Sequence, residues 1–172
     1  MSYQIRDVDL QSVPYIHEMN EGSLPHVNSV TLEYFRAQVG SDSYFRAAYG
    51  GGDAAAFLLA MSERADYDSM NFLWFKDRYP RFIYIDRVIV GEGHRRAGLG
   101  ASLYADLVQW ASLRRPLLAC EVNLRPSNEP SLRFHGKQGF TPVGTQETDG
   151  GRKTVSLMIR KLAGWRMEHD TR

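Results

Sequence analysis

Hydrophobic and polar positions along this chain follow two patterns, one typical of strands and one typical of helices. Apolar runs rich in aromatic and β-branched residues predict strands at 2–8, 43–50, 54–63, 82–90, 115–123, 140–147 and 154–162. Apolar residues recurring every three or four positions predict helices at 9–22, 32–39, 101–113 and 127–138. Gly50-Gly51-Gly52-Asp53 predicts a hairpin turn between the second and third strands.

Segment 64–81 fits neither the strand pattern nor the helix pattern. It reads RADYDSMNFLWFKDRYPR and is rich in aromatic residues but has no clear period. Loops of this length in compact domains are usually functional or disordered, and the aromatic content favours an ordered flap packed on the domain. We therefore expect a flap at 64–81.

The order of the elements predicts the fold class. A strand, a helix and a strand follow one another from 82 to 123, which requires a parallel pair with a right-handed crossover. The two last strands form an antiparallel hairpin around Asp149-Gly150-Gly151. We expect a mixed α/β sheet of six to seven strands flanked by about four helices, in a single domain over 1–162, with a polar tail at 163–172.

Composition excludes several classes of protein. The chain of 172 residues has 21 Lys+Arg against 20 Asp+Glu, so it has no global basic field for nucleic acid. No apolar stretch approaches the ~18–20 residues that span a bilayer, and the N-terminus lacks an apolar signal core, so we expect a cytoplasmic protein with no membrane partner. The single cysteine, Cys120, lies in an apolar strand and is expected to pack rather than react. The histidines lack ligand spacing, so no metal is expected.

A glycine turn joins the strand at 82–90 to the helix at 101–113. It reads Arg95-Arg96-Ala97-Gly98-Leu99-Gly100. Amides at a helix start have no partner inside the helix, and glycines let an anion approach them, so this turn predicts a pyrophosphate site. The alternative is a tight turn with solvated arginines. A P-loop would need Gly-Lys-Ser/Thr at the end of the turn, and this turn lacks it. A dinucleotide-binding fingerprint would need a third glycine, which is also absent.

With this loop and a second motif, the sequence resembles the GNAT superfamily of N-acetyltransferases. The pyrophosphate loop of that family reads Arg/Gln-x-x-Gly-x-Gly/Ala and is matched at 95–100, after the strand end Val88-Ile89-Val90. The second signature of the family is matched at 128–140, NEPSLRFHGKQGF, except that His135 stands where relatives often have a tyrosine. Either motif alone is weak, and the pair in this order is strong.

The resemblance implies a splayed GNAT-like sheet with acetyl-CoA as co-substrate. The pantetheine arm would lie along 86–90 and the pyrophosphate on the loop. The implied cofactor-binding residues are Val88, Ile89, Val90, Arg95, Arg96, Ala97, Gly98, Leu99, Gly100, Asn128 and Ser131. For Asn128 a helix cap is a compatible second role.

The resemblance implies direct attack of an amine on the thioester, which needs an uncharged amine and a proton for the thiolate. His135 is a candidate acid, with a packed helix residue as the alternative. Asp86 is a candidate base, with a salt bridge to Arg87 as the alternative. Glu121 is another candidate, and an acid inside a strand needs a partner.

The acceptor side is less clear from the sequence. Relatives shape it with the connection between the first two helices, here 17–28 with Glu18, Asn20 and Glu21, and the flap adds Asp66 and Asp68. We expect an N-acetyltransferase acting on a primary amine of a small molecule or peptide. The alternatives are a non-catalytic module that binds CoA or acyl-CoA and an enzyme with a longer acyl donor. Many relatives pair into dimers, so a homodimer is a further expectation.

Overall fold

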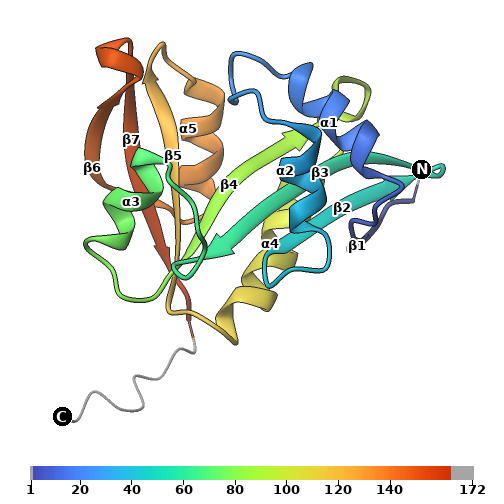
Figure 1. Cartoon of the computed structure of the whole chain (residues 1–172), viewed down its shortest axis with the longest axis horizontal. Helices are drawn as coiled ribbons and strands as arrows, with labels where there is room; N and C mark the ends of the chain where they lie inside the picture. The colour runs from blue at the N-terminus through green and yellow to red at the C-terminus, as the bar shows by residue number, and fades with distance from the viewer. Residues whose placement is uncertain (1, 164–172) are drawn as a thin grey trace. The chain divides into compact units, whose positions relative to one another are not determined.

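The computed structural model describes residues 2–163, and within them it contains seven strands and five α-helices (Figure 1). The strands are β1 (Gln4–Asp7), β2 (Tyr44–Gly50), β3 (Asp53–Ser62), β4 (Ile83–Val90), β5 (Leu117–Arg125), β6 (Thr141–Thr148) and β7 (Lys153–Lys161). The helices are α1 (Val13–Glu21), α2 (Leu32–Gln38), α3 (Met70–Lys76), α4 (Leu99–Ser112) and α5 (Glu129–Lys137), with short 3-10 turns η1 (Glu92–His94) and η2 (Asp149–Gly151). All but the first residue of the predicted tail 163–172 lies outside the described residues.

The strands form one mixed sheet in the order β1-β2-β3-β4-β5-β7-β6. β4 and β5 pair in parallel, while β1 with β2, β2 with β3, and β7 with both β5 and β6 pair antiparallel. The prediction of a mixed α/β sheet of six to seven strands is confirmed. The structure has one helix more than the expected four, because α3 lies inside the segment predicted as a flap.

The chain divides into two compact units, which we describe separately. The first comprises residues Met1–Ser62 and Ile85–Leu107, and the second Glu63–Tyr84 and Val108–Arg172. The single domain expected over 1–162 stays a prediction.

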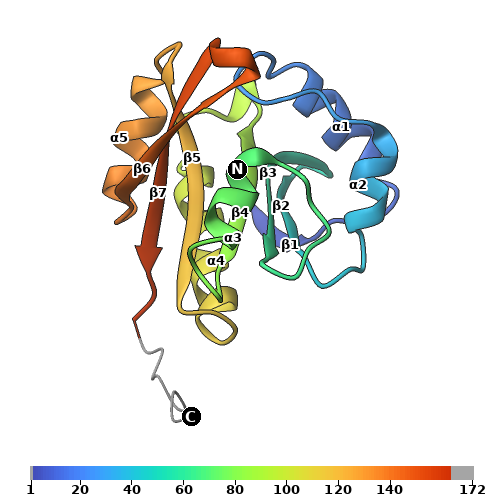
Figure 2. The same ribbon diagram turned by 60° about the vertical axis from the view of Figure 1, so that its left-hand side comes forward.

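In the first unit, helices cover both faces of β2. Tyr44 of β2 donates a hydrogen bond to Asp106 of α4 over 2.7 Å. The next residue, Phe45, points to the opposite face, where its ring stacks on Phe35 of α2 with centroids 5.8 Å apart. Helices α1 and α2 lie together beside β1–β3 (Figure 2). Thr31 caps α2 by accepting a hydrogen bond from the Tyr34 amide.

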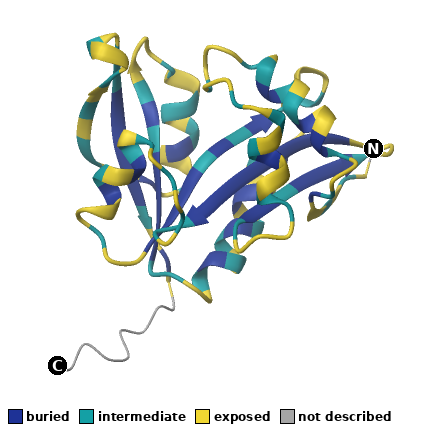
Figure 3. Ribbon diagram, in the orientation of Figure 1, coloured by how far each residue is buried: buried dark blue, intermediate teal, exposed yellow. Residues whose placement is uncertain are grey.

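In the second unit, α3 and α5 lie on opposite sides of β5, β6 and β7 (Figure 2). Phe72 and Phe75 of α3 are fully buried, and their rings lie 5.4 Å and 6.1 Å from the ring of Tyr84. β5 and β7 are buried over most of their length (Figure 3). The core of this unit therefore includes aromatic residues of the flap on one face of the strands.

The flap is ordered and packed, as its aromatic content predicts. At its base, Glu63 accepts hydrogen bonds from Arg115 over 2.6 Å and from the Phe82 amide over 3.3 Å. At its far end, Trp74 lies against Gly144 of β6, where an added Cβ would come within 2.9 Å of the indole. A side chain at position 144 would displace Trp74, so glycine is required there by close packing.

Candidate functional site

The turn before α4 has the geometry of an anion site. Ser102 donates the first helical hydrogen bond, to the Gly98 carbonyl over 3.0 Å, so the amides of residues 99–101 precede the first turn of bonding. Arg96 and Gly98 have φ angles of +68° and +74°, which fold the loop back over the helix start. A Cβ built on Gly98 would meet no protein atom within 4 Å, so the space over this backbone is open.

The charges around this turn favour an anion. Arg95 and Arg96 are exposed, and the 14-residue helix α4 adds the positive end of its dipole. The predicted loop residues 95–100 are thus brought together at one helix start.

Strand β4 pairs in parallel with β5 at Ile83 with Leu118 and at Tyr84 with Ala119, and it continues to Val90. Val88 and Val90 are half-buried, whereas the Ile89 side chain is part of the core.

The second predicted motif forms the start of α5. Asn128 is the N-cap and accepts a hydrogen bond from the Ser131 amide over 3.3 Å, so its capping role is present. His135 is buried, and its ring contacts Phe134 and Phe140 with centroids 5.4 Å away in both cases.

The contacts of His135 favour the packed alternative over an acid. Its Nδ1 lies 2.8 Å from the Ser131 carbonyl, which accepts hydrogen bonds only, so Nδ1 carries a proton. Burial lowers the pKa of His135 below its ordinary value of 6.5, which favours the neutral ring. A neutral ring protonated at Nδ1 has no proton on Nε2 to donate. Its role as an acid stays a prediction.

Asp86 is held in the salt bridge that the sequence offered as an alternative. The Nε of Arg87 lies 2.6 Å from the Asp86 carboxylate, and both side chains are 4% exposed. Tyr34 of α2 donates a second hydrogen bond to the same oxygen over 3.0 Å. Arg87 also donates to Asn20 of α1 over 2.7 Å. These contacts tie β4 to α1 and α2, and a role of Asp86 as a base stays a prediction.

Glu121 has the partner that a strand-interior acid requires. Tyr84 donates a hydrogen bond to its carboxylate over 2.6 Å, and Tyr84 is buried while Glu121 is half-buried. The sequence did not indicate this pair, because it depends on the register between two strands 37 residues apart. The hydrogen bond orients a carboxylate that solvent reaches.

Two of the residues predicted to bind the acceptor amine in the first unit make hydrogen bonds within the protein. Asn20 is fully buried against Arg87. Glu21 accepts hydrogen bonds from Asn20 over 2.9 Å and Ser29 over 2.8 Å, and these bonds lower its pKa. Glu18, like Asp66 and Asp68 of the flap, is exposed.

Other predictions concern residues outside these clusters. Cys120 is buried, and burial raises the pKa of its thiol, so the prediction of a packing role is confirmed. Among residues 2–163, no three His, Cys, Asp or Glu side chains are arranged to hold a metal ion. Within the same residues, every helix is too short or too polar to cross a bilayer.

Several solved structures have a fold similar to that of this chain. The ribosomal-protein-S18-alanine N-acetyltransferase of Escherichia coli superposes with a TM-score of 0.74 at 15% identity, over 99% of this chain and 100% of that one. NAA60 of Arabidopsis thaliana, in complex with a bisubstrate analogue, gives 0.75 at 18% identity, over 95% and 99%. A putative acetyltransferase of Salmonella typhimurium with its cofactor acetyl-CoA gives 0.73 at 17% identity, over 99% and 100%.

These identities show a shared fold, and the family model adds sequence evidence. A comparison with curated protein sequences finds no significant match. The model of the acetyltransferase (GNAT) family matches residues 14–140, which include the loop 95–100 and the signature beginning at Asn128. The chain therefore belongs to the acetyltransferase (GNAT) family and is an acyltransferase.

Proposed function

We propose that this protein transfers the acetyl group of acetyl-CoA to a primary amine of a small molecule or peptide, by direct attack of the amine. The observation that carries the proposal is the helix start at 95–100, with unbonded leading amides, two arginines and open space above Gly98. This arrangement fits a diphosphate, which acetyl-CoA carries.

The first unit would bind the co-substrate. The amides of the loop and the guanidinium groups of Arg95 and Arg96 would hold the pyrophosphate. The main chain of 86–90, which precedes this loop in the same unit, would bind the pantetheine arm. Bound acetyl-CoA supplies the activated acyl group as a thioester.

The reaction also needs a base. An attacking amine must be uncharged, so its ammonium form has to lose a proton. We assign this proton to Glu121, because its carboxylate is half-buried and oriented by Tyr84 over 2.6 Å. We assign no catalytic step to Asp86 or His135. Asp86 is held in a buried salt bridge with Arg87, and the Nδ1 of His135 is bonded to the Ser131 carbonyl. The thiolate leaves without a protein acid and takes its proton from solvent.

The test is release of free thiol from acetyl-CoA across a panel of primary amines. We expect thiol release with wild type, and a kcat lowered about 10²–10⁴-fold in Glu121→Gln. Glutamine still accepts the hydrogen bond of Tyr84, so the fold is kept. Glu147→Gln removes the same charge from an exposed position on β6 and should leave kcat unchanged.

Three outcomes would contradict the proposal. CoA binding without thiol release on any amine would favour the alternative of a non-catalytic module that senses or scaffolds. Equal kcat values for Glu121→Gln and wild type would remove Glu121 from the mechanism. Faster turnover with longer acyl thioesters than with acetyl-CoA would favour the other alternative.

A further inference from the structure

Half-buried polar side chains continue along the sheet face that carries Glu121. Glu121 of β5 pairs with Leu157 of β7, and Asn123 pairs with Val155. Side chains alternate between faces along a strand, so Lys153, four residues before Leu157, points to the same face as Glu121. Asn123 and Lys153 are both half-buried.

These two side chains have no partners in the protein. Among the residues that the structure describes, neither the Asn123 amide nor the Lys153 ammonium makes a hydrogen bond or ion pair with another side chain or the main chain. Lys153 is half-buried as a residue, but no buried side-chain nitrogen of the described residues lacks a partner, so its ammonium group reaches solvent. An ammonium group that pairs with no protein anion is available to bind an anionic group of a ligand.

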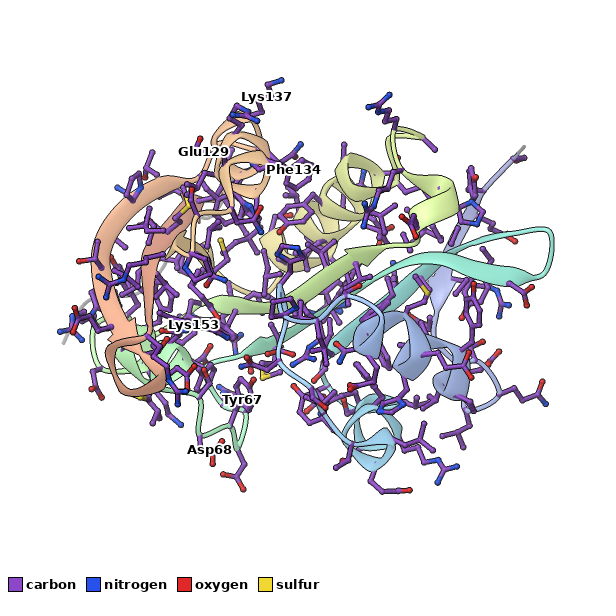
Figure 4. The ribbon with its side chains drawn as sticks, turned by 90° about the horizontal axis from the view of Figure 1, so that it is seen from above. Tyr67, Asp68, Glu129, Phe134, Lys137 and Lys153 are labelled. Carbon is purple, nitrogen blue, oxygen red and sulfur yellow. The ribbon has the colours of Figure 1, made fainter. Side chains whose placement is uncertain are left out.

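The flap divides this face into two parts. Phe72 and Phe75 cover the part around Tyr84, and Trp74 covers Gly144 of β6. Toward Lys153, this face carries the half-buried side chains of Asn123 and Lys153 beside the buried Val155. Figure 4 shows Lys153 on the same side as Tyr67 and Asp68 of the flap, and Glu129, Phe134 and Lys137 of α5 on the other side. We call the side chains Glu121, Asn123 and Lys153 the polar strip.

We propose that the polar strip binds the acceptor, and that this acceptor carries a carboxylate several bonds away from its amine. The inference rests on the proposed function, with Glu121 facing the amine and Lys153 binding the carboxylate. Asn123 lies between them in register and would bond the connecting polar groups. Lys153 is then a specificity-determining residue.

The register sets the length of the acceptor. Four residues along β7 and one strand spacing separate the Cα atoms of Glu121 and Lys153 by roughly 14 Å. Side chains leaning toward each other along the strands reduce the gap between the charged groups to roughly 5–10 Å. This gap is too wide for the adjacent amine and carboxylate of one α-amino acid. It fits a short peptide or an ω-amino acid.

The experiment compares acid and amide acceptors of matched length. Glycine, diglycine, triglycine and ω-amino acids are assayed against their carboxamides by thiol release from acetyl-CoA. We expect wild type to favour the acid at the longer lengths by at least tenfold in kcat/KM, mainly through KM. Lys153→Gln should lower kcat/KM for the acids to the level of the amides, and Lys153→Arg should retain the preference.

The matched control lies on the same strand. Lys161 is four residues beyond Leu157, as Lys153 is four residues before it, so both lie on the same face at the same distance along β7. Lys161→Gln removes the same charge at the far end of β7 and should leave the preference intact.

The outcomes separate the inference from the function on which it rests. Equal turnover of acids and amides by wild type would overturn the inference and leave the acetyltransferase assignment standing. If Lys153→Gln and Lys161→Gln lost the preference for acids to the same extent, the inference would also be overturned. The preference would then come from the overall positive charge of β7 and not from Lys153 itself. Absence of thiol release from every acid, amide and panel amine would overturn both.

Discussion

Replacing Gly98 by alanine separates the strain of the loop from its role as an anion site. Gly98 has a φ of +74°, and Gly40, at the end of α2, has a φ of +71°. An added Cβ meets no atom within 4 Å at either position. The two substitutions therefore carry the same backbone penalty of about 1–2 kcal/mol and no steric clash. In a chain of this size, each should lower Tm by roughly 2–8 °C.

Only Gly98→Ala should also weaken CoA binding. Its Cβ would stand over the leading amides of α4, where the diphosphate is proposed to lie. Loss of one hydrogen bond to a charged group costs about 1.5–3 kcal/mol, which corresponds to roughly 10–100-fold in Kd. Gly40 lies at the C-terminal end of α2, away from that helix start, so Gly40→Ala should bind CoA as wild type does.

Thermal unfolding without ligand and titration calorimetry with CoA measure the two effects separately. The expected pattern is a similar fall in Tm for both variants and a rise in Kd for Gly98→Ala alone. If Gly98→Ala lost stability but bound CoA as tightly as wild type, the loop would be a tight turn only. The assignment of the pyrophosphate site would then be wrong.

Two further predictions concern buried polar groups. Burial lowers the folded-state pKa of His135, so protons bind more readily to the unfolded chain, and stability should fall as pH drops below 6.5, by at most ~1.4 kcal/mol per pH unit. Urea unfolding from pH 7 to pH 5 should show a weaker fall in His135→Gln, and an unchanged fall would exclude this residue as the cause. Arg87→Met leaves the Asp86 carboxylate buried without its cation and should cost about 3–5 kcal/mol in urea unfolding. Adding Asp86→Asn should recover part of that loss, whereas strictly additive losses would show that the pair is not coupled.

Local features of this protein were determined by the sequence. Thr31 and Asn128 cap their helices because a side-chain oxygen and an amide three residues on are all that a cap requires. The loop at 95–100 is equally local, since its glycines and the helix that follows define the amides that it presents. The mixed sheet followed from the order of the elements. Helix α3 was missed, because seven residues are too few to display a helical period.

Pairings between distant segments were decided only by the tertiary structure. The hydrogen bond from Tyr84 to Glu121 and the placement of Lys153 on the same face depend on strand register, which the residues of one strand alone do not specify. His135 occupies a position of the motif, but packing against Phe140 determines that it is buried. A short motif is a property of neighbouring residues. The environment of a side chain depends on segments brought together by folding.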